Sequence, residues 1–170
     1  MNSILERWNA LDVSTAESEI LPCCGSRAWA QELAALRPFA GPQDLLRTSD
    51  DVWSNLDIAD WDEAFASHPR IGERKAPASA TAQSAQWSTQ EQSAAELSDA
   101  QIQEQLKRAN AAYEARFGRI YIVCAAGKSA EEMLAILERR LENEDAAELR
   151  EAVEQQRQIT QLRLRKWLQL

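Results

Sequence analysis

The sequence is poor in several residue types, and each scarcity excludes something. Only one histidine occurs among 170 residues, and the three cysteines, Cys23, Cys24 and Cys124, form no C-x-x-C pair. A metal site made of cysteine and histidine is therefore poorly supported, and the odd number of cysteines favours a reduced setting. Glycine and proline number five each, which is few for a protein built from many tight turns.

Long apolar runs are also absent. The longest, IYIVCAAG at residues 120–127, is too short to span a bilayer. The first residues, MNSILERWNAL, lack the basic segment and apolar core of a signal peptide, and the final LQL is not the usual peroxisomal tripeptide. The formal net charge of −8 disfavours binding to nucleic acid and to anionic membranes. We therefore expect a cytoplasmic protein that binds neither nucleic acid nor membranes.

The residues that are abundant favour helices. Ala, Leu, Glu, Gln and Arg dominate, and all are good helix formers. Apolar residues recur at helical spacing before Gly118, a natural helix stop, and Ser129 and Glu132 have the spacing of a capping box. Residues 119–125, RIYIVCA, alternate like a strand, but no second strand is evident to pair with them. The sequence predicts an all-α, single-domain bundle of about eight helices over residues 1–170, with an extended connector at RIYIVCA.

Residues 72–86, GERKAPASATAQSAQ, have no apolar period, and we interpret them as a loop. The helix expected after this loop has Ser88 as its candidate N-terminal cap. Gly127 to Ser129, GKS, do not make a phosphate-binding loop, because position 122 is Ile where that motif needs a glycine. The adjacent Cys23 and Cys24 are more typical of small core residues than of a redox site.

The single histidine lies in residues 68–73, HPRIGE, directly after the helical pattern DWDEAFA. Pro69 fixes the backbone that follows His68, and Gly72 permits a close backbone approach. Arg70 and Glu73 add charge on both sides, although the sequence does not define their roles. Imidazole is the side chain best able to exchange a proton near neutral pH, so His68 is a candidate acid or base. A lone histidine at a helix end is otherwise more often structural.

Two further segments carry polar groups suited to a ligand. In WSTQEQ, residues 87–92, Ser88, Glu91 and Gln92 lie on one face if the segment is helical, although a solvated helix start would explain them equally. In QITQLRLRKWL, residues 158–168, Arg163 is expected beside the apolar face, where it either snorkels to solvent or holds an anion or a carbonyl pair. Arg157 and Arg165 are alternatives that periodicity does not exclude.

The HPRIGE segment resembles the signature of the 2-oxo-4-hydroxy-4-carboxy-5-ureidoimidazoline (OHCU) decarboxylase family. WSTQEQ is similar to the Ser-x-x-Glu-Gln segment of that family. Residues 113–143, YEARFGRIYIVCAAGKSAEEMLAILERRLEN, are similar to its Phe-Gly, its extended stretch and the helix that follows. QITQLRLRKWL is similar to its C-terminal helix. The resemblance covers most of the chain from about residue 60, whereas the first third agrees only in helical pattern.

This resemblance implies a homodimer that needs no metal or other cofactor and converts OHCU to (S)-allantoin in urate breakdown. It implies that His68 is the catalytic imidazole. The substrate-binding residues that it implies, in part through their backbone groups, are Pro69, Ser88, Glu91, Gln92, Phe117, Ile120, Ile122 and Arg163. His68, Glu91 and Arg163 are then expected to converge in one pocket.

The chemistry of the residues agrees with this implication. Loss of CO2 leaves an electron pair, and the conjugated ring of OHCU supplies its own sink, so the protein need only orient the ring and move protons. His68 either takes the proton of the hydroxyl beside the carboxylate or delivers a proton afterwards, and the sequence does not choose between these. Two alternatives stay open: a helical interaction domain without catalysis, and an enzyme acting on another hydantoin or ureido compound.

Overall fold

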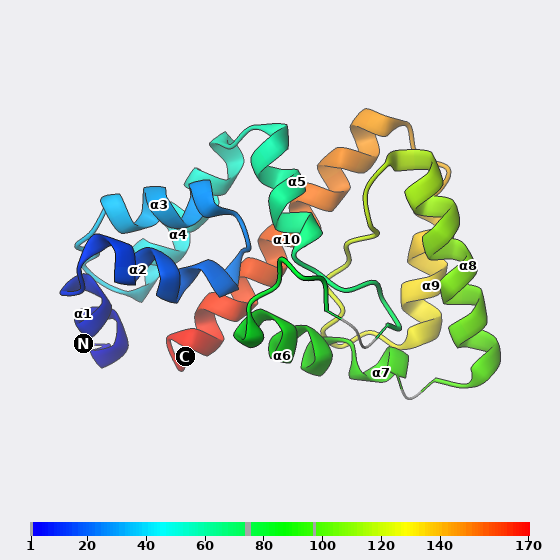
Figure 1. Cartoon of the computed structure of the whole chain (residues 1–170), viewed down its shortest axis with the longest axis horizontal. Coiled ribbons are helices and arrows are strands. Elements are labelled where there is room, and N and C mark those ends of the chain that lie inside the picture. The colour runs from blue at the N-terminus through cyan, green and yellow to red at the C-terminus, as the bar shows by residue number, and fades with distance from the viewer. Residues whose placement is uncertain (1, 74–75, 97) are drawn as a thin grey trace. The chain divides into compact units, whose positions relative to one another are not determined.

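The computed structural model of the protein describes residues 2–73, 76–96 and 98–170. These residues form ten α-helices and one 3-10 helix and contain no strand, so the all-α prediction is confirmed, with roughly the expected number of helices (Figure 1). The elements are α1 (Ser3–Asn9), α2 (Val13–Ile20), η1 (Leu21–Cys23), α3 (Arg27–Ala35), α4 (Pro42–Asn55), α5 (Ile58–Ala66), α6 (Ala82–Glu91), α7 (Ser93–Glu96), α8 (Ala100–Phe117), α9 (Ala130–Arg140) and α10 (Asp145–Trp167). None of these helices is both long and apolar enough to cross a membrane.

The chain forms two compact units. The first unit comprises the chain up to Ala64 together with Arg157–Leu170, and the second comprises Phe65–Gln156. Helix α10 therefore contributes its first half to the second unit and its second half to the first. The expectation of a single domain stays a prediction.

The first unit is built around buried tryptophans. Trp8, Trp29 and Trp53 are each no more than 1% exposed, and burial of such large rings is a main source of core stability. Their indole N–H groups need buried partners: Trp8 Nε1 donates to the Ala16 carbonyl at 3.0 Å, and Trp29 Nε1 donates to Ser49 Oγ at 3.2 Å. Helix α3 packs against both α2 and α4.

The second unit is centred on helices α8 and α9, which lie side by side (Figure 1). Its core includes Leu106, Tyr113, Met133 and Leu137, all wholly buried, together with residues of the extended segment between the two helices. Residues 119–125 of that segment contain no helix or strand, and Tyr121 to Ala125 are buried. The prediction of an extended connector is therefore confirmed.

Local signals at the ends of α8 and α9 behave as the sequence predicts. Gly118 follows α8 with φ of +68°, a left-handed conformation that glycine adopts without a steric penalty, and its N–H donates to the Glu114 carbonyl. Ser129 and Glu132 form the capping box at the start of α9.

The start of α6 differs from the sequence prediction. The helix begins at Ala82 and is capped by Thr81, whose hydroxyl accepts from the Ser84 N–H at 3.0 Å. Residues 82–86 are therefore helical and not part of a loop, and Ser88 lies inside the helix and not at its cap. The predicted loop also includes Arg74 and Lys75, which lie outside the described residues.

Candidate active site

The segment HPRIGE forms a turn that begins one residue beyond α5, which ends at Ala66. His68 is 8% exposed and Pro69 is buried, so the turn places the imidazole within the unit and not on a solvated loop. Gly72 has φ of +88°, which favours glycine at this position. The Glu73 N–H donates to the Arg70 carbonyl at 3.0 Å and closes the turn.

Two side chains hold the backbone of this turn: Gln92, the C-cap residue of α6, and Asn110 of α8. The Gly72 N–H donates to Gln92 Oε1 at 3.0 Å, and Asn110 Nδ2 donates to the Ile71 carbonyl at 3.0 Å. Arg70 Nη2 donates to Glu114 Oε2 at 3.0 Å. The contact of Asn110 is buried and that of Gln92 is part-buried, and both satisfy backbone groups of the turn, so they help to define its conformation.

The imidazole itself contacts α10. His68 Nε2 lies 2.7 Å from Oε1 of Gln156, a residue with no exposed surface. Gln156 is 88 positions from His68 in the sequence. A ring held at one nitrogen by a buried amide has a fixed orientation, which is what proton transfer at a defined point requires.

The segment WSTQEQ is helical through Glu91, which is the condition for the polar face expected there. Ser88 and Glu91 lie on α6, and Gln92 is the residue that ends it. Ser88 is 2% exposed and Gln92 is 4% exposed, so these two polar side chains are buried and do not belong to a solvated helix start. Glu91 is half-buried. The amide of Gln92 links this face to the HPRIGE turn through Gly72.

Side chains of α9 and α10 anchor the connector by hydrogen bonds to two of its backbone groups. The Cys124 N–H donates to Gln155 Oε1 at 2.8 Å, and the Ile122 carbonyl accepts from Arg140 Nη1 at 2.6 Å. Phe117 packs in the core of the second unit and Ile120 is partly exposed. Two backbone groups of the connector thus have defined positions, which is compatible with the ligand-binding role expected for residues 117–122.

A buried ion pair holds the connector through Arg140. The side chains of Arg140 and Glu148 are both 0% exposed, and Arg140 Nε donates to Glu148 Oε1 at 2.9 Å. The Tyr113 hydroxyl donates to the same carboxylate, and burial raises the pKa of Tyr113, so the phenol stays a donor. The Arg140 guanidinium also lies 4.9 Å from the ring centre of Tyr121 in the connector.

Arg163 belongs to the first unit, where it is 1% exposed and its Nη1 donates to the Pro22 carbonyl at 3.2 Å. The alternative arginines have other surroundings: Arg157 pairs with Asp50 at 2.9 Å, and Arg165 is exposed. Arg163 is the only one of these three arginines that is buried, and it stays the candidate site residue among them. Its convergence with His68 and Glu91 stays a prediction.

The cysteines fit the core interpretation. Cys23, Cys24 and Cys124 are buried and none forms a disulfide. Burial raises the pKa of Cys24 to about 12 and also raises that of Cys23, so both remain protonated thiols near neutral pH. A protonated, buried thiol is a poor nucleophile.

We expect these thiols to be unreactive in the native protein. Ellman's reagent at pH 8 should give no colour within minutes, because burial protects all three sulfurs and protonation also protects Cys23 and Cys24, and it should report all three thiols after denaturation. Rapid reaction of a native cysteine would instead indicate an accessible, activated thiol.

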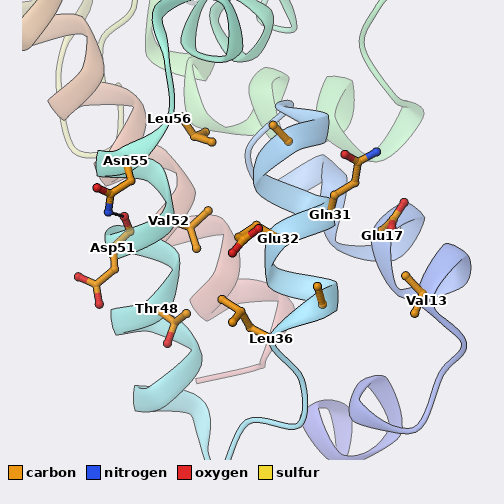
Figure 2. A pocket seen from close by; sticks show the side chains of 12 residues that line it. Val13, Glu17, Gln31, Glu32, Leu36, Thr48, Asp51, Val52, Asn55 and Leu56 are labelled. Carbon is orange, nitrogen blue, oxygen red and sulfur yellow. Dashed lines mark hydrogen bonds between the residues drawn. The ribbon is translucent and has the colours of Figure 1, made fainter.

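A separate hollow of about 790 Å³ lies entirely within the first unit, between α2, α3 and α4 (Figure 2). Apolar side chains such as Val52 and Leu36 line it together with the carboxylates of Glu17, Glu32 and Asp51. None of the predicted site residues lines this hollow.

With this geometry in place, comparison with known proteins decides the family. The model of the OHCU decarboxylase family matches residues 9–165. The chain belongs to the OHCU decarboxylase family. The resemblance seen in the sequence is thereby confirmed, and the match includes the N-terminal third, for which no motif was evident.

Individual proteins and a solved structure are also similar to this chain. The uric acid degradation bifunctional protein TTL of Arabidopsis thaliana is 38% identical over 152 residues, which are 88% of this chain and 46% of that protein. The OHCU decarboxylase of Amia calva is 35% identical over 134 residues, 78% of this chain and 75% of that protein. A crystal structure of OHCU decarboxylase in the presence of (S)-allantoin matches with a TM-score of 0.77 and 33% identity, covering 89% of this chain and 98% of the other.

Sequence reasoning missed the residues that position the OHCU decarboxylase motif, chiefly Gln156 and Asn110. A signal for Gln156 was present: Glu148, Ala152, Gln156 and Ile159 recur at helical spacing and are all buried. A glutamine on the buried stripe of a helix requires a buried partner. Nothing in the sequence alone indicates that this partner is His68.

Proposed function

We propose that this chain decarboxylates OHCU without a cofactor and yields (S)-allantoin in urate breakdown. The family match carries the proposal, and the Amia calva relative bears the name of this carboxy-lyase. The chain spans about half the length of the Arabidopsis relative, so its activity is proposed for this domain alone. The observation that supports it within the molecule is the buried His68 imidazole, held by Gln156 in a turn that Gln92 also anchors.

The proposed reaction needs only acid and base groups. The bond between the ring carbon and the carboxylate breaks, CO2 leaves, and the electron pair enters the conjugated ring. The ring nitrogen that receives the electron pair takes up a proton from solvent, the 4-hydroxyl loses its proton as it becomes a carbonyl, and the adjacent ring carbon gains a proton on one face. His68 is proposed to move one of these protons. Pro69, Ser88, Glu91, Gln92 and Arg163, with backbone groups at Phe117, Ile120 and Ile122, are proposed to hold the ring and the ureido group.

Absence of a cofactor is part of the proposal. The described residues contain no group of three or more His, Cys, Asp or Glu side chains placed to hold a metal ion. The substrate's own conjugation provides the electron sink that a cofactor supplies elsewhere. From the resemblance we also propose a homodimer and a cytoplasmic location.

The proposal is tested by adding OHCU, made freshly from urate, to the purified protein. We expect the substrate absorbance to decay much faster than its spontaneous decay, with a circular dichroism signal of (S)-allantoin. Prior dialysis against EDTA should leave the rate unchanged. Decay at the spontaneous rate with no optical activity would favour a non-catalytic helical domain, and turnover of another ureido compound alone would redirect the substrate assignment.

A further inference from the structure

The contact between His68 and Gln156 defines more than the position of the imidazole. Gln156 Oε1 lies 2.7 Å from His68 Nε2, a short hydrogen-bond distance, and Gln156 has no exposed surface. An amide oxygen accepts hydrogen bonds and does not donate them. A hydrogen bond to this oxygen therefore requires a proton on His68 Nε2.

A neutral imidazole has one N–H donor and one acceptor nitrogen. We propose that Gln156 is a positioning residue that holds His68 in the Nε2–H tautomer, which makes Nδ1 the basic nitrogen of the neutral ring. The consequence for catalysis, that the proton is exchanged at Nδ1, rests on the proposed decarboxylase function. The tautomer itself does not depend on that function.

Gln155, the residue before Gln156 on α10, also makes a hydrogen bond that joins α10 to another segment. Gln155 Oε1 accepts from the Cys124 N–H at 2.8 Å, so two consecutive amides of one helix hold the connector and the imidazole. Consecutive side chains on an α-helix point in directions about 100° apart, so each reaches a different segment. Helix α10 thereby fixes the connector and the HPRIGE turn from one rigid element.

The single histidine makes the tautomer directly measurable. In an untagged protein labelled with ¹⁵N-histidine, the two ring nitrogens give the only imidazole signals. At alkaline pH, where the ring is neutral, we expect a pyrrole-type shift for Nε2 and a pyridine-type shift for Nδ1, without averaging. A ring protonated at Nδ1, or two averaged shifts, would overturn the proposal without any variant.

Variants separate the role of Gln156 from general packing. Gln156→Leu removes the acceptor and should give averaged shifts, whereas Gln156→Glu retains an acceptor and should keep the Nε2–H tautomer. Gln155→Leu, the matched control on the same helix, should leave the His68 shifts unchanged. Unaltered shifts in Gln156→Leu would contradict the proposal, and if that variant does not fold, the wild-type spectrum and Gln156→Glu still decide.

Turnover provides a second measurement. In Gln156→Leu we expect kcat to fall about 10-fold to 100-fold with little change in KM, as for other partners that orient a functional imidazole, and Gln156→Glu should retain more turnover. If the wild-type protein shows the fixed tautomer but Gln156→Leu keeps an unchanged kcat, the proposed effect of Gln156 on catalysis is contradicted. If the wild-type protein does not turn over OHCU, the proposed function fails while the tautomer result stands.

Discussion

His68→Asn is expected to lower the rate of OHCU decarboxylation by about 10²–10⁴-fold, the usual worth of a positioned acid or base. Asparagine retains polarity and hydrogen bonding, and an amide can still pair with the buried Gln156 side chain. It has no group that exchanges a proton near neutral pH. The fold should persist, because Gln92 and Asn110 hold the turn by hydrogen bonds to its backbone. These bonds do not involve the imidazole.

The variant should be studied by turnover, thermal unfolding and binding of (S)-allantoin together. A folded, slow enzyme that still binds (S)-allantoin supports the catalytic role of His68. Arg70→Gln is a suitable control in the same turn. It removes the ion pair with Glu114, but the Arg70 side chain is 44% exposed, so we expect turnover to change little. Near-full turnover in His68→Asn removes the residue from the mechanism, and unfolding would assign it a structural role.

Arg140→Met is expected to reduce the free energy of unfolding by about 3–5 kcal/mol. The substitution leaves the Glu148 carboxylate buried without its cationic partner and leaves the Ile122 carbonyl without its donor. Both groups are shielded from water, so neither loss is compensated by solvation. Equilibrium urea unfolding measures the change.

The neighbouring arginine provides a matched control. Arg139 pairs with Glu151 through two bonds of 2.9 Å, but the Arg139 side chain is 58% exposed. Arg139→Met should therefore cost no more than about 1 kcal/mol. Replacing both members of the buried pair, Arg140→Met with Glu148→Leu, should be less destabilising than Arg140→Met alone. Equal losses for the two single variants would contradict the assigned role of the buried pair.

Local chemistry made much of the fold predictable. Gly118 and the Ser129–Glu132 capping box define helix ends through contacts within a few residues, so their sequence pattern is sufficient. Helix α6 was placed too late because its first turns contain Ala, Ser and Gln and give no apolar stripe. Its start depends on Thr81, a cap that the pattern did not single out.

The candidate site was predictable only in part. HPRIGE and WSTQEQ are contiguous motifs, so the sequence alone is enough to propose His68, Ser88 and Gln92 as site residues. The residues that hold them act across long separations: Asn110 lies 39 positions from Ile71, and Gln156 lies 88 positions from His68. Such pairs follow from how helices pack, and neither spacing nor periodicity in one sequence specifies them.

A crystal structure of the protein with (S)-allantoin bound tests the central claim most directly. We predict that the ligand contacts His68, Glu91 and backbone groups of the connector, and that the Arg163 guanidinium reaches it. Binding of (S)-allantoin elsewhere, or contact with Arg157 or Arg165 in place of Arg163, would contradict the proposed site.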